Sequence, residues 1–190
     1  MANPWDVRPV ASTGDWDPNH LFTAVGRALT EWAQLENAWS EVFAIIIFAP
    51  VRKKFQAPAI RAYGSVNTFN GRCAMLSAAG EAFFHKRHRK RQHVKALEPK
   101  FRQLITESLQ FAGRRNEIAH GEVDEILFFK PRHKLRSLGY FLLPSLYNPK
   151  KFKLTEEVTF QYTSGDVIYY SQEFTKLRLR IGGLRNELSL

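Results

Sequence analysis

Apolar residues recur at helical spacing along most of the chain, and this pattern predicts its main elements. From residue 18 to Pro50, leucine, valine, alanine, tryptophan and isoleucine repeat every three or four residues, as on one face of an α-helix. Asp17 and Pro18 precede this run as an N-cap and a first-turn proline. The pattern therefore predicts a long amphipathic helix that begins at Pro18.

Two further helical patterns follow in the first two thirds of the chain. A basic loop around residues 52–58 is expected to separate the first helix from a second, which begins near Ser65 or Asn67. A third pattern follows Pro99 and ends at Gly121, a residue that suits a left-handed helix cap. Both helices are predicted to bury one apolar face.

After Gly121 the period shortens, and it becomes helical again only at Thr163. Thr163 and Asp166 match a capping box, and Gly182 with Gly183 predicts either a weakened fourth helix or close packing against a neighbour. The expected fold class is mainly α, a bundle of four long helices with a small β-meander inserted between the third and fourth. Short runs rich in aromatic and β-branched residues, separated by prolines, predict the strands: 126–129, 138–143 and 157–162.

Length and composition favour one folded domain, residues 1–190. Residues 1–17 are aperiodic and predict a loosely held N-terminal arm, and residues 122–162 form the strand insertion. The chain is 44% hydrophobic, which is ample for a packed core. Its single cysteine, Cys73, lies on a predicted apolar face and fits a reducing compartment. The start lacks a signal-peptide layout and no apolar run could span a membrane, so a cytoplasmic protein is expected.

The charge of the chain indicates an anionic partner. The formal net charge is +10, which favours nucleic acid before an anionic membrane or an acidic protein. Residues 85–95 hold six Lys or Arg and three His with few apolar positions, so they form either a solvated surface or a phosphate-contacting patch. No metal or cofactor is expected, because these histidines lack carboxylate or cysteine neighbours at ligand spacing. The candidate nucleic-acid-binding residues are Lys86, Arg87, Arg89, Lys90, Arg91 and Arg114.

Polar residues break the apolar pattern near the end of the third helix. On a helical wheel, Arg115 and Asn116 project into the apolar arc and His120 lies at its border, whereas Arg114 and Glu117 fall on the solvated side. A guanidinium that faces a core needs a partner or a cleft. Such contradictions of a pattern often mark functional residues.

Glu36 likewise projects into the apolar arc of the first helix. Glu36 is therefore expected to meet Arg115 or to share a cleft with it. The pair would be either a buried structural ion pair or a site in which the carboxylate supports a catalytic group. Trp32 and Trp39, one heptad apart, are predicted to lie in the core or in a dimer interface.

The segment from Arg115 through Asn116 to His120, Arg-Asn-x-x-x-His at a helix end, resembles the HEPN superfamily signature. The resemblance covers roughly residues 18–121 and 163–189. It implies a helical bundle and, as in many members, a metal-independent ribonuclease of toxin–antitoxin or defence systems. It also implies RNA as partner, a homodimer that brings two motifs to one cleft, and an antitoxin or regulatory protein as a further partner.

The residue types suit this chemistry. The 2′-hydroxyl of RNA is the nucleophile, and His120 would take its proton or donate one to the leaving 5′-oxygen. Arg115 would hold the scissile phosphate, and Asn116, one turn before His120, would orient the ring or bind phosphate. Glu36 would position Arg115.

A structural or binding-only interpretation of the same residues is the alternative. A histidine near a helix C-terminus is favoured by the helix dipole, and Arg115 would then only neutralise Glu36. Some HEPN-like domains are thought to bind nucleic acid, nucleotide or a partner without cleavage. The chain is then a non-catalytic HEPN-like nucleic-acid- or partner-binding protein, or an antitoxin-like helical protein whose basic surface meets an acidic partner.

Overall fold

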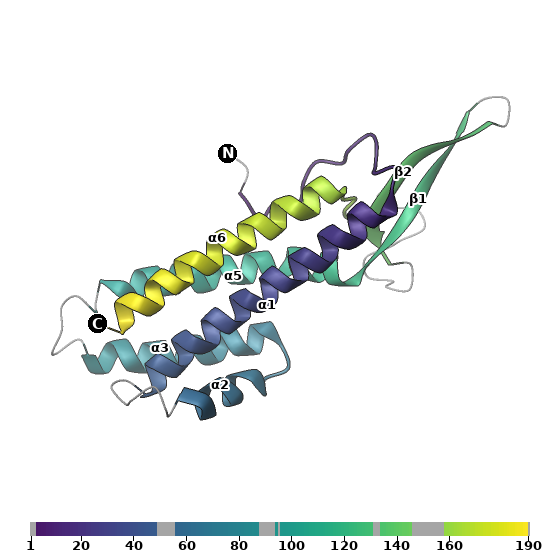
Figure 1. Cartoon of the computed structure of the whole chain (residues 1–190). Helices are drawn as coiled ribbons and strands as arrows, with labels where there is room; N and C mark the ends of the chain where they lie inside the picture. Colours follow the sequence, from purple (N-terminus) through teal and green to yellow (C-terminus); the bar gives the residue numbers. More distant parts are fainter. Residues whose placement is uncertain are drawn as a thin grey trace. The chain divides into compact units, whose positions relative to one another are not determined.

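The computed structural model describes residues 3–48, 56–87, 94, 96–130, 134–145 and 158–189. This part of the chain is mainly helical and carries one antiparallel pair of strands, so the predicted mainly α class is confirmed at that level. In chain order the elements are α1 (Pro18–Phe48), α2 (Gln56–Gly64), α3 (Phe69–Arg87), α5 (Leu97–His120), β1 (Gly121–Lys130), β2 (Lys134–Pro144) and α6 (Ser164–Leu188) (Figure 1).

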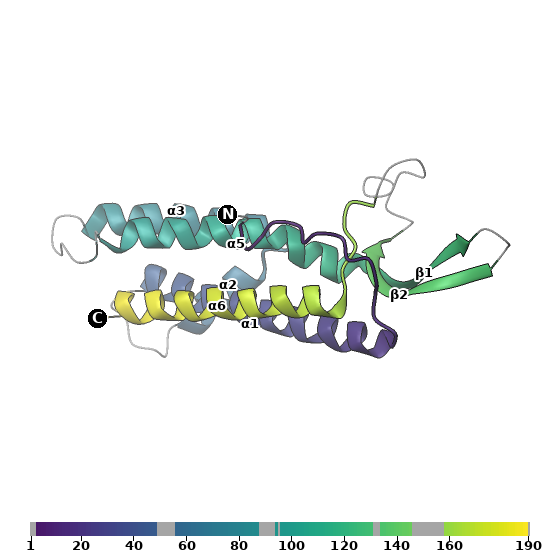
Figure 2. The same ribbon diagram turned by 90° about the horizontal axis from the view of Figure 1, so that it is seen from above.

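The chain divides into two compact units, to both of which the helices α1, α5 and α6 contribute. The first unit comprises Met1–Trp32 and Gly113–Phe174, and the second comprises Ala33–Ala112 and Thr175–Leu190. Within the first unit, the start of α1, the end of α5 and the start of α6 lie near the base of the β1–β2 hairpin (Figures 1 and 2).

Local sequence signals set the starts of α1 and α6 as predicted, whereas α3 begins at Phe69 rather than near Ser65 or Asn67, and α5 begins at Leu97 rather than after Pro99. Asp17 accepts a hydrogen bond from the Asn19 backbone N–H at 2.9 Å, and α1 begins at Pro18. The capping box of α6 is also confirmed. The Thr163 N–H donates to the Asp166 carboxylate at 3.0 Å, and the Asp166 N–H donates back to the Thr163 hydroxyl at 3.3 Å.

Aromatic side chains fill the core of each unit. In the second unit, Trp39 meets Phe101 edge-on at 5.9 Å between ring centres, and its indole N–H donates to Ser108 at 3.0 Å. In the first unit, Trp32 meets Phe174 edge-on at 5.1 Å. Trp32, Trp39 and Cys73 are all buried, as the core prediction required.

The loop predicted around residues 52–58 is partly helical. Residues 52–54 lie outside the described residues, but Pro58 falls in the first turn of α2, where a missing N–H costs no hydrogen bond. Ala59 and Tyr63 are buried and form the inward face of α2. The prediction of a loop at Pro58 was therefore wrong, because proline is tolerated in the first turn of a helix.

Among the described residues, the predicted β-meander is a two-stranded hairpin. β1 and β2 pair from Gly121↔Pro144 to Lys130↔Lys134, with a register shift between Glu125 and Leu127. Opposite this shift Gly139 adopts φ +96°, the left-handed region. The third predicted strand, 157–162, was wrong: its described part, from residue 158, joins the hairpin through a single bridge, Leu142 to Tyr162, before the capping box turns the chain into α6.

Gly121 is not the left-handed cap that the sequence predicts. Positive φ is confined to Gly139 among the glycines that the structure describes, and Gly121 instead begins β1 directly after α5. A Cβ at Gly121 would lie 2.9 Å from the Glu117 carbonyl oxygen and equally close to the Leu142 side chain. Glycine is needed here because the backbone passes too close to its neighbours for any side chain.

The N-terminal arm is anchored, contrary to the prediction that it is loosely held. The Gly14 N–H donates to the Leu138 carbonyl at 2.7 Å, and Asp15 exchanges backbone hydrogen bonds with Tyr140 at 2.7 and 2.9 Å. The Asp15 carboxylate also accepts from the N–H and hydroxyl of Ser164, at 2.7 and 2.6 Å. Because these contacts are long-range, the aperiodic sequence of the arm could not reveal them.

The paired glycines of α6 do not serve close packing. A Cβ built at Gly182 or Gly183 meets no atom within 4 Å, and α6 continues unbroken through both residues. The close-packing alternative was therefore wrong.

Candidate functional site

The three predicted catalytic residues lie in the last two turns of α5. Arg115 is half-buried, and its Nη1 donates to the Asn116 side-chain oxygen at 3.0 Å. The Arg115 guanidinium also lies 6.0 Å from the ring centre of the buried Trp32, at the outer limit of a cation–π contact. The core-facing prediction therefore holds in part for Arg115, but it was wrong for Asn116, which is exposed.

His120 is the last residue of α5 and is exposed. Asn116 and His120 are four residues apart, so they share one face of the helix. The His120 ring makes no hydrogen bond with the part of the chain that the structure describes, including Asn116, whose side-chain oxygen accepts from Arg115. Asn116 and His120 are thus exposed near the junction between α5 and β1, and the half-buried Arg115 is hydrogen-bonded to Asn116.

A buried polar cluster lies on another side of the same turns. The Tyr162 hydroxyl donates to the Glu117 carboxylate at 2.6 Å, and Arg114 donates to the Tyr162 hydroxyl at 3.1 Å. Arg114 also forms an ion pair with Glu117 at 3.0 Å. Glu117 is 9% exposed and Tyr162 is fully buried, so the prediction that Arg114 and Glu117 are solvated was wrong.

The electrostatics of this cluster keep Tyr162 protonated. Burial, together with the adjacent Glu117 carboxylate, raises the pKa of the Tyr162 hydroxyl far above its ordinary value, although Arg114 opposes the shift. The Tyr162 hydroxyl therefore stays protonated at neutral pH and donates to Glu117. These contacts stabilise the helical turn that carries Arg115 and Asn116. The helical wheel missed it because Tyr162 reaches α5 from 45 residues away; the only local signal was the i,i+3 spacing of Arg114 and Glu117.

Glu36 has a partner that the helical wheel did not suggest. Its carboxylate accepts from Arg72 of α3 at 2.5 Å, and both side chains are less than one-fifth exposed. Arg72 also donates to the Val66 carbonyl at 2.9 Å and lies over the Tyr63 ring. The Glu36 charge is thus neutralised within the second unit, which removes the reason for expecting Arg115 as its counter-ion.

Cys73 is buried near the Glu36 carboxylate and is not a reactive thiol. Burial raises its pKa to about 12, with a further contribution from the Glu36 carboxylate. A thiol with so high a pKa carries little thiolate at neutral pH. Cys73 is accordingly a core residue, as its apolar surroundings predict.

The basic stretch at 85–95 is described only in part. His85 is exposed on α3, and Lys86 and Arg87 are its last two helical residues, with side chains outside the description. Arg89, Lys90 and Arg91 also lie outside the described residues. Their role in binding nucleic acid stays a prediction.

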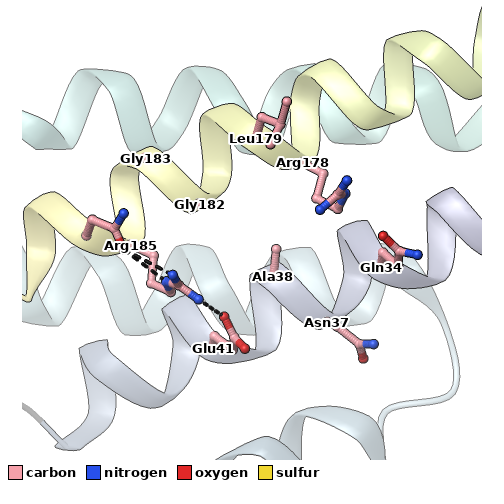
Figure 3. Close-up of a pocket in the computed structure, with 10 residues that line it drawn as sticks. Gln34, Asn37, Ala38, Glu41, Arg178, Leu179, Gly182, Gly183 and Arg185 are labelled. Carbon is pink, nitrogen blue, oxygen red and sulfur yellow. Dashed lines mark hydrogen bonds and ion pairs between the residues drawn. The ribbon is translucent and has the colours of Figure 1, made fainter.

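An open groove of about 620 Å³ lies between α1 and α6 in the second unit (Figure 3). Gln34 and Asn37 line it from α1, and Arg178 with Gly182 lines it from α6. At one end Arg185 donates to Glu41 and closes an ion pair across the two helices. None of the predicted site residues lies in this groove.

Neither a metal site nor a membrane span emerges from the described residues. No three His, Cys, Asp or Glu side chains in that part of the chain gather where they could hold a metal ion. None of the described helices is long and apolar enough to cross a membrane. Comparison with protein-family models, curated proteins and solved structures finds no match to this chain.

Proposed function

We propose that this chain is a HEPN-like, metal-independent endoribonuclease whose site is formed by Arg115, Asn116 and His120. The observation that carries the proposal is the Arg115–Asn116 hydrogen bond of 3.0 Å on an exposed face, with His120 one turn later. The guanidinium and the carboxamide are hydrogen-bonded to each other, and the imidazole follows one helical turn after the carboxamide, at the end of α5. The net charge of +10 supports an RNA substrate.

Each residue has a distinct role in the proposed reaction. Arg115 binds a non-bridging oxygen of the scissile phosphate and stabilises the charge that accumulates in the transition state. Asn116 holds the guanidinium through its oxygen and offers its NH₂ group to the phosphate. The Arg114–Glu117–Tyr162 cluster fixes the backbone that carries both residues, as positioning a phosphate requires.

His120 performs the proton transfer. The RNA 2′-hydroxyl loses its proton to the imidazole and attacks the adjacent phosphorus, and the bond to the 5′-oxygen breaks as that oxygen receives a proton from solvent water; the imidazolium then returns its proton to the solvent. The products are a 2′,3′-cyclic phosphate and a 5′-hydroxyl end. A homodimer that presents two copies of the motif to one RNA, and an antitoxin-like protein that covers it, belong to this proposal.

RNA binding without cleavage is the second candidate. One observation favours it: the His120 ring makes no hydrogen bond with a described residue, whereas a general base is commonly oriented by a third group. In that case Arg115 and His120 only contact phosphates.

A cleavage assay separates the two candidates. Labelled structured and unstructured RNAs are incubated with the protein in EDTA, beside His120→Ala and Arg115→Ala. Arg102→Ala is the matched control for Arg115→Ala, because it removes an exposed arginine of α5 that belongs to the second unit and lies outside the basic stretch 85–95. Cleavage lost only in the first pair, with cyclic-phosphate ends in the wild-type products, supports the enzyme. Salt-sensitive binding without cleavage supports the binding protein.

A further inference from the structure

We infer that the outer edge of β1 is an interface at which a second copy of this chain pairs its own β1, in antiparallel orientation, to form a four-stranded sheet. The β1–β2 hairpin lies wholly in the first unit and extends away from its base in both views (Figures 1 and 2). The inference goes beyond the proposed function and does not rest on it, because it concerns association of the protein without RNA.

The outer edge of β2 is covered, whereas that of β1 is open. Tyr140 of β2 exchanges two backbone hydrogen bonds with Asp15, at 2.7 and 2.9 Å, and Leu142 exchanges two with Tyr162, at 2.8 and 3.0 Å. Within the described parts of the chain, β1 forms its backbone ladder with β2 and with no other segment. An open strand edge is a template for the addition of another strand.

The pairing register shows which backbone groups of β1 face this open edge. Residues directly opposite each other in an antiparallel pair either exchange both hydrogen bonds or both point away from each other. Tyr140 and Leu142 point away from β1, so their partners Glu125 and Val123 also direct their N–H and C=O groups outward. The Glu125 N–H is held by the Asp124 carboxylate at 2.8 Å, a local contact that strand pairing would replace.

The far half of the hairpin leaves apolar surface exposed. Leu127 is 50% exposed and Leu135 is 56% exposed. Leu127 pairs with Ser137, two residues from Leu135 along β2, so both leucines lie on one face. A two-stranded hairpin is marginally stable by itself in water, and further strands stabilise it. Side chains of an added strand would cover these leucines.

The charges of β1 identify the occupant of the edge as a second copy. The strand carries carboxylates near its start, at Glu122, Asp124 and Glu125, and a lysine at its end, Lys130. Two antiparallel copies related by a two-fold axis therefore set the acidic start of each strand beside the basic end of the other. The same carboxylates would repel an acidic strand, which makes the edge selective.

Like-charge repulsion also selects the register of the two β1 strands. The extra residue at the register shift lies in β2, so the alternation of outward groups continues along β1. Of the registers that set outward groups opposite each other, one opposes Glu125 to its own copy and another opposes Asp124 to its own copy. The register that sets Glu122 opposite Lys130 avoids both, and symmetry repeats this favourable pair.

This register determines how far apart the two candidate sites lie. His120 directly precedes β1, so the two copies of His120 fall at opposite ends of the paired strands. At about 3.4 Å per strand residue, they are roughly 40 Å apart along the strands. One RNA would reach both sites only by spanning that distance.

Sedimentation equilibrium of the full chain without RNA tests the interface. The wild type is expected to dimerise as its concentration rises. Lys130→Glu sets like charges opposite each other twice and should weaken the dimer roughly five- to thirty-fold. Adding Glu122→Lys to Lys130→Glu reverses both charges and should restore the affinity. Arg27→Glu is the matched control, because it makes the same change of charge at an exposed position of α1 in the same unit.

Amide hydrogen exchange locates the interface independently of these variants. The Val123 amide should exchange more slowly as the dimer forms, because its N–H becomes hydrogen-bonded. A wild type that stays monomeric, a Lys130→Glu dimer as tight as that of Arg27→Glu, or a dimer in which Val123 exchange is unchanged would each overturn the inference. A dimer with these properties that never cleaves RNA would retain the interface and refute the enzyme, whereas a monomer that cleaves RNA would refute the interface alone.

Discussion

The Tyr162 hydroxyl donates a 2.6 Å hydrogen bond to the carboxylate of Glu117 and so ties the chain before α6 to the last turns of α5. Glu117 is also paired with Arg114, so Tyr162 and Arg114 both donate to the carboxylate in a buried setting. A buried carboxylate that loses a donor keeps its desolvation cost without the compensating bond. The proposed site therefore depends on a contact between two segments that are distant in sequence.

Tyr162→Phe is expected to lower the free energy of unfolding by about 1–3 kcal/mol, because it deprives Glu117 of a hydrogen bond while leaving the ring in place. Urea unfolding followed by circular dichroism measures the change. Tyr140→Phe is the control: Tyr140 is half-buried in the same unit and its hydroxyl makes no hydrogen bond with a described residue. Equal stability of the two variants would show that the Tyr162–Glu117 bond contributes nothing.

Two glycine substitutions should have opposite effects. Gly139→Ala places a side chain at φ +96° and a Cβ 2.8 Å from the Asp15 carbonyl oxygen, so a loss of roughly 2 kcal/mol is expected. Gly182→Ala places a methyl group in open space inside α6 and should gain about 0.5–1 kcal/mol through helix propensity. Thermal unfolding of both variants tests the pair, and a stabilised Gly139→Ala would contradict the bulge geometry.

Glu36→Gln should affect stability and leave RNA cleavage unchanged. It weakens the ion pair with Arg72, and a loss of roughly 1–3 kcal/mol is expected from a partly buried, charge-assisted hydrogen bond. Unfolding and cleavage are measured on the same preparation, at a temperature where the variant is folded. Loss of cleavage by a folded Glu36→Gln protein would restore the role for Glu36 that the sequence suggested.

Cys73 predicts a specific dependence of stability on alkaline pH. Its pKa is raised from an ordinary value of 9.0 to about 12 in the folded state, so the unfolded chain ionises first. The stability linked to this thiol is complete below pH 9 and is lost as the pH rises toward 12. Between pH 8 and pH 10 the wild type should lose about 1 kcal/mol more than Cys73→Ala. Cys73 adds to the raised pKa of Tyr63, but burial, the larger cause, remains in Cys73→Ala and keeps Tyr63 protonated in both folded proteins between pH 8 and pH 10, so the tyrosine contributions cancel. Equal losses would contradict the raised pKa of Cys73.

The sequence predicted features that depend on neighbouring residues and missed those that depend on distant ones. The start of α1 at Pro18 and the Thr163–Asp166 box could be predicted, because capping involves residues two or three apart. The anchoring of Asp15 could not, because its partners Tyr140 and Ser164 lie more than a hundred residues away.

The same limit applies to the candidate site. A helical wheel identifies the apolar side of α5. It correctly predicted that Arg115 lies at the edge of that side, where its guanidinium is near the buried Trp32 ring. It placed Glu117 in solvent because it cannot include a residue such as Tyr162, which covers α5 from another segment. Exposure of an aromatic residue such as Trp16 is likewise a tertiary property that periodicity does not encode.

The most direct test of the central claim is the end chemistry of RNA incubated in EDTA with the wild type and with His120→Ala. The proposed mechanism predicts wild-type fragments with 2′,3′-cyclic phosphate and 5′-hydroxyl ends, and at least a hundred-fold slower cleavage by a folded His120→Ala protein. Equal cleavage rates for the two proteins, or fragments with 5′-phosphate ends, would contradict a site built on His120.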